Sequence, residues 1–332
     1  MNREEFLEKY QKVPVREYNH EVGTTPMVSV CVQTYQHQDF IRQCLDGILM
    51  QETTFDIEIL LGEDNSVDGT RDICTEYAKK YPDKIRLFLH HRENNISVSD
   101  RPTGRFNFTY NLFSARGKYI AICEGDDYWT DPLKLQKQVD FLESHPDYVI
   151  CGHDAFIFDE KGTVQESKLP DSNKRDFHSE DLQIGVFILT LSACFRNVIE
   201  DIPPHFMRVL NADSFLFSYL GQFGHYKYMP EIKPAAYRVH EGGMWSLVQK
   251  QEKLISNITT KYWKAMYFQS INKNEIKEAQ MAKIIINIID SLGQFKWRTF
   301  FQLLYHITRA IIKTKFPIIF QIKKSLERNS SH

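Results

Sequence analysis

The sequence predicts an α/β protein, with a mainly parallel sheet flanked by helices and then a helical region at the C-terminal end. Between about residues 27 and 160, short β-branched apolar runs alternate with segments whose apolar residues recur at helical spacing. Strands joined by crossover helices produce this alternation. From Ser246 onward the strand pattern stops and only helical spacing remains. With 332 residues, 42% of them hydrophobic, the chain is long enough to bury a sizeable core.

The expected strands are apolar runs suited to burial on both faces. They lie over 28–32, 57–61, 85–89, 119–123 and 148–158. Between them we expect helices, with Asp39 and Asp68 as caps of the first two and Pro132 in the first turn of a later helix over 131–144. A mixed region follows, for which the expected elements are a strand over 187–192, a helix over 211–221, and helices over 281–292 and 294–313.

Charge is nearly balanced over the whole chain but not along it. The 41 Lys and Arg against 43 Asp and Glu leave a formal charge of −2, so we expect no nucleic-acid partner. Residues 294–328, however, carry eight basic residues and one acidic residue, which leaves −9 for the rest. A helix over 294–313 would place apolar residues on one face and basic residues opposite. Such a helix either lies on an anionic membrane surface or packs its apolar face on the preceding domain.

The sequence also indicates a cytoplasmic location. The first residues are charged throughout and lack the apolar segment of a secretory signal. No apolar run approaches the roughly 20 residues that cross a bilayer. The six cysteines are scattered singly, without metal-finger spacing, as is typical of reduced buried thiols. We expect a cytoplasmic protein, with peripheral attachment to the inner face of the membrane if the basic tail binds lipid.

Polar residues follow three of the expected strands at the point where each strand ends. They are the segments 33–35, 63–66 and 124–129, and two of the three are acidic. The carboxyl ends of parallel strands meet at one edge of a sheet, so these groups should share a crevice. A phosphate would enter such an acidic crevice only with a divalent cation, Mg²⁺ or Mn²⁺. The first strand-to-helix turn, 33–39, has no glycine, which argues against a Gly-rich phosphate loop.

Each of these groups suits one part of a nucleotide. Asp64 can read the base and Tyr35 can stack on it. Asp126 and Asp127 can hold a metal ion that neutralises the diphosphate. Trp129 either stacks on a sugar or packs beneath the loop.

Three segments carry a resemblance to a known family: VSVCVQTYQHQDFIRQCLDGIL, EILLGEDNSVDGT and GKYIAICEGDDYWTDPLKLQKQVDFL. In this order and spacing they resemble the nucleotide-binding half of family-2 glycosyltransferases with the GT-A fold. The resemblance implies a Rossmann-like sheet and metal-dependent transfer, with inversion, of a sugar from a nucleotide diphosphate, usually of uridine. The acceptor would be a hydroxyl of a glycan or lipid-linked oligosaccharide in surface polysaccharide synthesis.

The pattern along the chain predicts a division into regions, and the resemblance implies a role for each matching residue. Residues 1–26 would be a leader, 27–245 the catalytic domain with its nucleotide-binding half over 27–160 and its acceptor half over 161–245, and 246–332 a helical region. The matching residues are Gln33 and Tyr35 around the base, Asp64 bonded to the base, Asp126 at the ribose, Asp127 at the metal, and Arg105, preferred over Arg101, at the donor sugar or phosphate. Glu124 stands where the family often has aspartate.

The second half should supply the acceptor site and the base. Asp213 begins an apolar helix where the resemblance places the base, although an ordinary capping aspartate is the alternative. Glu200 and Asp201 are competing candidates. Arg238 and His240 precede two glycines, which suits a mobile loop over the diphosphate: Arg238 would neutralise it, and His240 would bind the metal or a phosphate. A buried structural histidine is the alternative for His240.

Two other functions stay open from the sequence. A sugar-1-phosphate nucleotidyltransferase also uses an α/β sheet with acidic metal ligands, but it would carry the Gly-rich loop that 33–39 lacks. A membrane-attached scaffold that binds a nucleotide sugar without turnover is the non-catalytic alternative.

Overall fold

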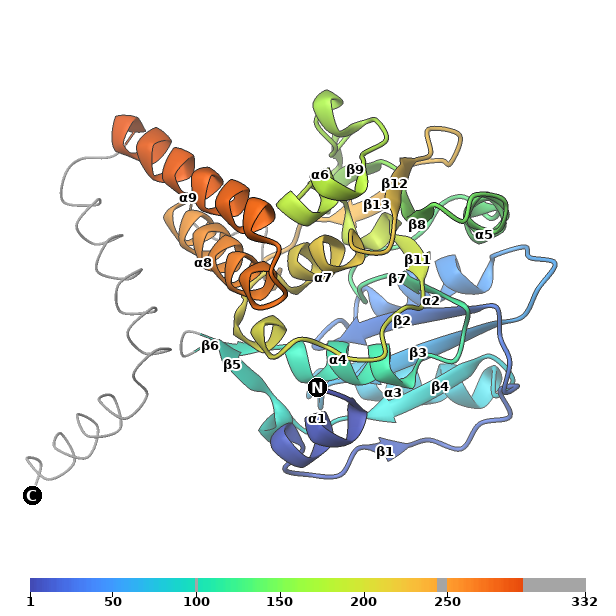
Figure 1. Ribbon diagram of the computed structural model, residues 1–332. Coiled ribbons are helices and arrows are strands. Elements are labelled where there is room, and N and C mark those ends of the chain that lie inside the picture. Colours follow the sequence, from blue (N-terminus) through green and yellow to red (C-terminus); the bar gives the residue numbers. More distant parts are fainter. Residues whose placement is uncertain (99–100, 244–249, 295–332) are drawn as a thin grey trace, which may run out of the picture. The chain divides into compact units, whose positions relative to one another are not determined.

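The computed structural model describes residues 1–98, 101–243 and 250–294 of the chain (Figure 1). The chain divides into two compact units: residues 1–207 with 212–247, and residues 208–211 with 248–332. The strands are β1 (Arg16–Glu17), β2 (Val28–Thr34), β3 (Ile57–Glu63), β4 (Ile85–Leu89), β5 (Ile96–Val98), β6 (Arg101–Thr103), β7 (Tyr119–Ile122), β8 (Tyr148–Gly152), β9 (Ala155–Asp159), β10 (Gly162–Gln165), β11 (Cys194–Arg196), β12 (His225–Tyr228) and β13 (Ala235–Arg238). The helices are α1 (Arg3–Tyr10), α2 (Ile41–Leu49), α3 (Thr70–Lys80), α4 (Arg105–Ser114), α5 (Lys134–Ser144), α6 (Ser179–Ile184), α7 (Ala212–Leu220), α8 (Lys250–Ser270) and α9 (Asn274–Gln294).

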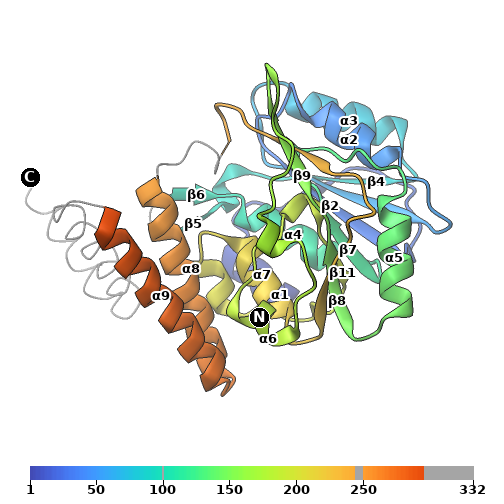
Figure 2. The ribbon, with the colours of Figure 1, turned by 90° about the horizontal axis from the view of Figure 1, so that it is seen from above.

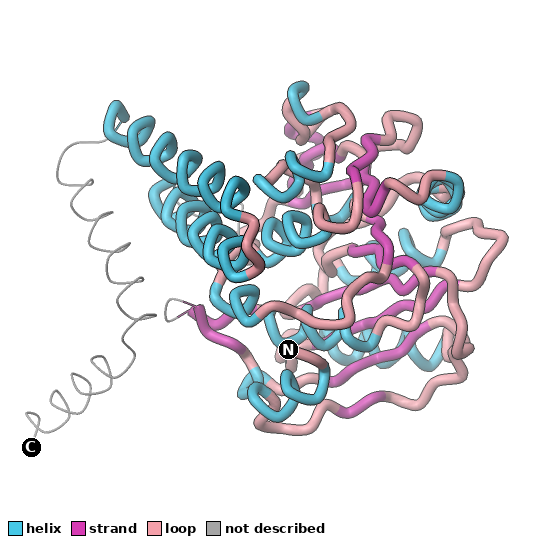
Figure 3. The backbone as a smooth tube through the Cα atoms, in the orientation of Figure 1, coloured by secondary structure: helices cyan, strands magenta, loops and turns pink. Residues whose placement is uncertain are grey.

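The first unit is built on an eight-stranded mixed sheet in the order β1-β4-β3-β2-β7-β11-β8-β12. Strands β4, β3, β2 and β7 are parallel to one another. Strand β1 pairs antiparallel with β4, and β11 pairs antiparallel with β7. Figure 3, in which strands are magenta, shows β2, β3 and β4 running side by side. The predicted α/β class with a mainly parallel sheet is therefore confirmed.

Helices cover both faces of this sheet. Val28, Val30 and Val32 of β2 point to one face, where they pack with apolar residues of α2, α3 and α5. Helix α4 lies on the opposite face, against β2 and β3 (Figure 2). The β-branched runs form central strands because both faces are buried, and each fully buried Val, Leu or Ile side chain contributes roughly 1.5–3 kcal/mol.

Helix α4 approaches β3 unusually closely at Gly62. The side-chain amide of Asn107 donates to the Gly62 carbonyl at 2.7 Å, and a Cβ at Gly62 would lie 1.8 Å from Asn107 Oδ1. We expect Gly62→Ala to lower the free energy of unfolding by about 1–3 kcal/mol, because the added methyl overpacks a buried contact. Denaturant unfolding measures this change. Gly23→Ala, whose Cβ would have no neighbour within 4 Å, is the matched control, and equal effects in both variants would refute the packing account.

Some predicted elements differ from the observed ones. The strand expected over 148–158 is two strands, because Asp154 breaks it: its carboxylate accepts from the Ala155 and Leu169 amides at 2.8 and 2.9 Å. The segment 187–192 does not form the predicted strand and ends in a short 3-10 helix, Thr190–Ser192. The next segment, β11, is the strand that pairs with β7 and β8. The helix over 131–144 begins at Lys134, past Pro132.

The two predicted caps behave differently. Asp39 does not cap α2: Phe40 holds the cap position, without a side-chain hydrogen bond. Asp68 does not hold the cap position of α3 either, since that residue is Gly69, but its Oδ1 accepts from the Thr70 amide at 3.0 Å and from the Thr70 hydroxyl at 2.7 Å, in the first residue of the helix.

The first 26 residues take part in the fold of the first unit. Phe6 of α1 is fully buried. Its ring stacks on that of Phe106 in α4, with 5.1 Å between the centroids, and lies 5.7 Å from the rings of Tyr10 and Phe113. Strand β1 pairs with β4. The six cysteines are free and buried, as expected.

The second unit contains α8 and α9, which pack on each other as an antiparallel hairpin (Figure 1). The helix predicted over 281–292 is confirmed as part of α9. The helix predicted over 294–313, with its basic tail, lies outside the described residues. Within the described ranges, no helix has both the length and the apolar character that a membrane span needs.

Candidate active site

The three polar strand ends meet around the end of β2. The Asp64 amide, just after β3, donates to the Thr34 carbonyl at 3.0 Å. On the other side, the Gly125 amide, just after β7, donates to the Gln33 carbonyl at 3.0 Å. Two strand spacings separate the flanking loops, so their backbones stand roughly 10 Å apart. The structure thus brings the predicted base-binding and metal-binding segments to one edge of the sheet.

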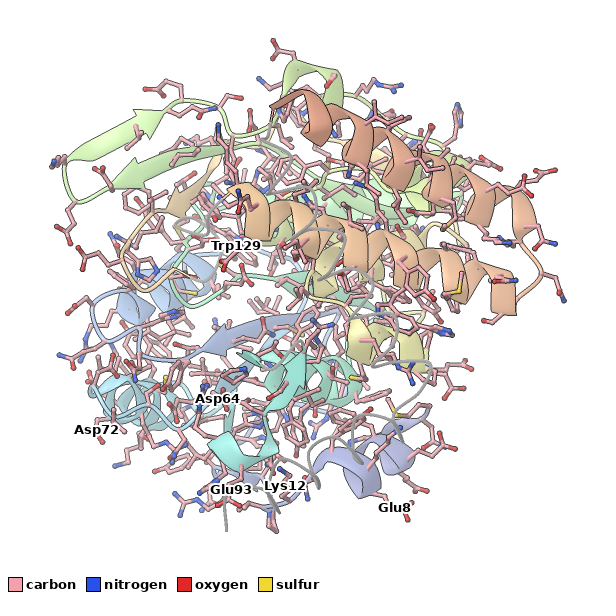
Figure 4. All side chains as sticks on the ribbon, turned by 90° about the vertical axis from the view of Figure 1, so that its left-hand side faces the viewer. Glu8, Lys12, Asp64, Asp72, Glu93 and Trp129 are labelled. Carbon is pink, nitrogen blue, oxygen red and sulfur yellow. The ribbon has the colours of Figure 1, made fainter. Side chains whose placement is uncertain are left out.

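The segment that carries Asp64 is held by the buried Glu63. The Glu63 carboxylate accepts from the amides of Asn65 and Ser66 at 3.2 and 2.6 Å and pairs with Arg71. The chain can turn here because Asn65 adopts a left-handed conformation with φ of 58°, which asparagine tolerates. Asp64 is therefore aimed by a rigid loop, and Figure 4 shows it inside the body of the first unit.

Asp64 and Tyr35 share a third residue, Arg92. The Arg92 guanidinium donates to Asp64 Oδ2 at 2.7 Å and stacks over the Tyr35 ring at 3.8 Å from its centroid. Burial raises the pKa of Asp64, and this outweighs the lowering by Arg92. Sequence reasoning missed Arg92. It follows β4, whose carboxyl end lies at the same edge, so an inspection of all four parallel strand ends would have found it.

Gln33 lies at the end of β2 and keeps an unsatisfied donor. Its buried Nε2 has no hydrogen-bond partner among the described residues. A buried polar atom without a partner costs about 1–3 kcal/mol, so it is a signal for a ligand atom at this position.

The loop after β7, residues 124–129, concentrates negative charge and is called the acidic loop below. Asp127 is 2% exposed, and its Oδ1 accepts from the Arg238 amide at 2.9 Å. Burial, then the charges of Asp126 and Glu124, raise the pKa of Asp127. The Glu124 side chain is exposed at the surface, but the protein around it still displaces much of its water. This desolvation, and after it the charges of Asp126 and Asp213, raise the pKa of Glu124 to about 8. This acidic cluster is suited to a divalent cation.

His240 lies against Asp126 rather than Asp127. Its Nε2 is 3.1 Å from Asp126 Oδ2, and Nε2 of His37 lies 4.0 Å from the same oxygen. Burial would raise the pKa of Asp126, but the hydrogen bond with His240 and the charge of His37 together lower it. His37, in the turn after β2, is a second residue that sequence reasoning missed.

Arg238 is fixed in place instead of belonging to the expected mobile loop. It is the last residue of β13, and its Nε donates to the Asp126 carbonyl at 2.9 Å. Its guanidinium lies 4.6 Å from the Phe40 ring centroid and 4.4 Å from that of Phe158. The mobile loop predicted around Arg238 and His240 therefore begins only after β13. Residues 244–249 lie outside the described residues.

Asp213 lies near the acidic loop. It is the second residue of α7, its Oδ2 accepts from the Thr190 hydroxyl at 2.9 Å, and its Oδ1 accepts from the Ser214 amide at 2.7 Å. Its charge is one of those that raise the pKa of Glu124. The competing candidates, Glu200 and Asp201, are exposed, and Asp201 lies 3.4 Å from the N-terminal amine.

Arg105 is buried against Phe206. It is 3% exposed, donates to the Phe206 carbonyl at 2.6 Å and lies over the Phe206 ring. Burial lowers its pKa to about 10, while the charge of Asp213 opposes that change. Its expected contact with the donor stays a prediction. Trp129 is buried beneath the acidic loop, where its Nε1 donates to the Leu191 carbonyl at 2.7 Å, so it packs.

The fold and the acidic strand ends define the GT-A class, and solved structures of that class resemble this chain. S. aureus TarS in complex with UDP-GlcNAc is 16% identical, with a TM-score of 0.59 over 86% of this chain and 80% of that one. A mannosyltransferase of Pyrobaculum calidifontis in complex with GDP-Man and Mn²⁺ is 16% identical, with a TM-score of 0.52 over 94% of this chain and 93% of that one. The chain belongs to glycosyl transferase family 2, whose model matches residues 29–203.

Relatives by sequence include an uncharacterized protein and a glycosyltransferase. An uncharacterized protein of Mycobacterium bovis is 38% identical over 220 residues, which are 66% of this chain and 60% of that protein. TuaG of Bacillus subtilis, provisionally named as a teichuronic acid biosynthesis glycosyltransferase, is 30% identical over 117 residues, which are 35% of this chain and 42% of TuaG. The chain thus spans less than two thirds of the length of these relatives.

Proposed function

We propose that this chain is a metal-dependent, inverting glycosyltransferase that moves a sugar from a nucleoside diphosphate to a hydroxyl of a glycan or lipid-linked oligosaccharide. The observation that carries the proposal is the placement of three groups around the end of β2. Tyr35, Asp64 and Arg92 form one side, the acidic loop after β7 forms the other, and Asp213 faces that loop.

The base pocket is the part of the site that recognises the nucleotide. We propose that Tyr35 stacks on the base, that Asp64 and Arg92 bond to its edge, and that Nε2 of Gln33, which has no partner in the described part of the chain, supplies a further donor. Asp126 would face the ribose. Uridine is the proposed nucleoside, supported by the sequence resemblance and by the UDP-sugar in the TarS complex.

A divalent ion, Mn²⁺ or Mg²⁺, fits the acidic loop. The crowding of carboxylates there is relieved by a cation, and Asp127 with His240 would hold it. When bound, such an ion supplies positive charge for the departing diphosphate. The Mn²⁺ in the mannosyltransferase complex supports this assignment. Arg238, held at the same loop, would add a second positive charge.

Transfer with inversion is a single displacement. The acceptor oxygen bonds to the anomeric carbon while the bond from that carbon to the diphosphate oxygen breaks. We assign Asp213 as the base that takes the acceptor proton. Thr190 orients its carboxylate, and Arg105 places a buried positive charge in electrostatic contact with it.

The acceptor and the location are proposed from the name of one relative and from the sequence. TuaG favours a polysaccharide acceptor by its name, and the sequence resemblance favours the same class. A cytoplasmic location, and attachment of the basic segment 294–328 to an anionic membrane, stay predictions from the sequence.

Donor hydrolysis separates the enzyme from its alternatives. Incubation with a UDP-sugar and Mn²⁺ should release UDP slowly without an acceptor, and Asp127→Asn should stop this release. Tight binding of UDP-sugar without hydrolysis or transfer would favour the non-catalytic scaffold. Formation of a nucleotide sugar from a sugar 1-phosphate and UTP would favour a nucleotidyltransferase.

Arg92 provides a test of the base pocket alone. We expect Arg92→Gln to weaken UDP binding about 10- to 100-fold, since a charge-assisted hydrogen bond contributes about 1.5–3 kcal/mol. Isothermal titration with UDP and Mn²⁺ measures this loss. Arg42→Gln, which removes an arginine exposed on α2 and paired with Glu76, is the control. If both variants bind UDP like the unmodified protein, Arg92 does not contact the base.

A further inference from the structure

Two histidines and an aspartate from three separate segments meet beside the acidic loop. His37 comes from the turn after β2, Asp126 from the loop after β7, and His240 follows β13. One candidate ligand atom from each, a ring nitrogen or a carboxylate oxygen, lies within 4.8 Å of the other two. Their side chains are 16%, 21% and 10% exposed, respectively, so the group is recessed but open to a small ion.

The structure fixes the backbone of His37 by hydrogen bonds and packs the rings of both histidines near Phe40, with the His37 ring centroid 6.1 Å from that of Phe40. The His37 amide donates to the Thr70 hydroxyl at 2.8 Å, and the His37 carbonyl accepts from the first amide of α2. The His240 ring packs edge-on against Phe40, with 4.5 Å between ring centroids. Neither ring therefore needs a large movement to take a ligand.

Gly125 lets the acidic loop approach His37. A Cβ at this position would lie 2.7 Å from Thr34 Oγ1 and 2.9 Å from His37 Nδ1. That Nδ1 is buried and has no hydrogen-bond partner among the described residues. The close approach places the ring of His37 where its Nε2 can face Asp126.

The spacing of the three groups suits one ion. With metal–ligand bonds of about 2.1 Å, ligand atoms at right angles stand roughly 3 Å apart and opposite ligands roughly 4.2 Å apart. The observed separations from Asp126 Oδ2 are 3.1 Å to His240 and 4.0 Å to His37. Asp127 has one oxygen left for the same ion, because its Oδ1 accepts from the Arg238 amide.

We propose that His37 and Oδ2 of Asp126 join His240 and Asp127 as ligands of the ion, with the other oxygen of Asp126 directed to the ribose, and that this two-imidazole site selects Mn²⁺ or Co²⁺ over Mg²⁺. The inference deepens the proposed function, since it defines the ion of the same site. Imidazole nitrogen favours first-row transition ions, whereas Mg²⁺ prefers oxygen ligands and keeps its water. Two neutral imidazoles also leave more of the ion's positive charge available to a diphosphate than two carboxylates would.

The first test is ion binding to the full chain, without donor or acceptor and again with UDP. Titration followed by the electron paramagnetic resonance of free Mn²⁺ should show a site that His37→Gln weakens at least about 10-fold. Mg²⁺ should displace Mn²⁺ only at about 100-fold or greater excess. His145→Gln changes an exposed histidine at the end of α5 and should bind Mn²⁺ normally.

The second test counts nitrogen ligands directly. Electron spin echo modulation of bound Mn²⁺ should show coupling to two imidazole nitrogens, and His37→Gln and His240→Gln should each leave one. Thermal melting of each variant confirms that it is folded. Unchanged Mn²⁺ affinity and nitrogen coupling in folded His37→Gln would overturn the proposal, as would equal affinity for Mg²⁺ or no Mn²⁺ binding with UDP present. Because none of these readouts needs sugar transfer, failure of the glycosyltransferase assignment would be seen separately, as ion binding without turnover.

Discussion

Asp213→Asn should lower kcat for sugar transfer about 10²- to 10⁴-fold while the Kd for the donor stays within about twofold. The amide keeps the shape of the side chain and can still meet the Thr190 hydroxyl, whose oxygen lies 2.9 Å from Asp213 Oδ2. It cannot take the proton of the acceptor hydroxyl. Steady-state kinetics with a saturating donor measures kcat, and titration with the donor nucleotide measures Kd.

Asp201→Asn is the control for this substitution. Asp201 lies in the competing pair of acidic residues but is exposed and faces the N-terminal amine. It should keep the activity of the unmodified protein. Equal losses of kcat and donor affinity in Asp213→Asn would instead make Asp213 a binding residue, and normal activity would exclude it as the base.

Asp127→Asn should reduce transfer and donor hydrolysis by about 10³-fold or more, with the fold intact. The substitution preserves an oxygen that can accept from the Arg238 amide, at 2.9 Å in the structure. It removes the negative charge that would hold the ion against the diphosphate, a contribution of several kcal/mol to the transition state. Product formation over a range of Mn²⁺ concentrations measures the effect.

Asp72→Asn is the matched control, since Asp72 is exposed on α3 (Figure 4). Its activity and its Mn²⁺ dependence should be unchanged. Normal turnover of Asp127→Asn at low Mn²⁺ would remove Asp127 from the metal site. A fall in melting temperature that accounts for the lost activity would give it a structural role only.

The positions of the three polar strand ends could be predicted because each rule involved is local. An apolar β-branched run such as 28–32 indicates a buried strand, and parallel strands necessarily end at one edge. Gln33, Asp64 and the acidic loop follow their strands directly in sequence. The structure brings these segments to the end of β2, and the α/β class and the family are confirmed.

What the sequence did not indicate depends on contacts between distant segments. Arg92 joins the proposed base pocket only because its guanidinium reaches Asp64 and Tyr35. The orientation of Arg105 is set by the carbonyl and ring of Phe206, which is 101 residues away in the chain. His37 reaches the acidic loop because residue 125 has no side chain. No local pattern encodes any of these three contacts.

The errors in secondary structure have the same origin. The run over 148–158 is apolar enough for one strand, but the Asp154 carboxylate takes over backbone amides and divides it. The apolar segment 187–192 has strand composition, and yet β11 fills the place between β7 and β8. Composition alone does not decide which of two neighbouring apolar segments joins a sheet.

A crystal structure with Mn²⁺ and UDP would show where both bind, because the anomalous signal of manganese locates the ion independently of the nucleotide. We expect an ion bonded to the carboxylates of the loop after β7, with the diphosphate on it and the base between Tyr35 and Asp64. An ion or a nucleotide bound elsewhere on the chain, with the end of β2 left empty at saturating UDP, would contradict it.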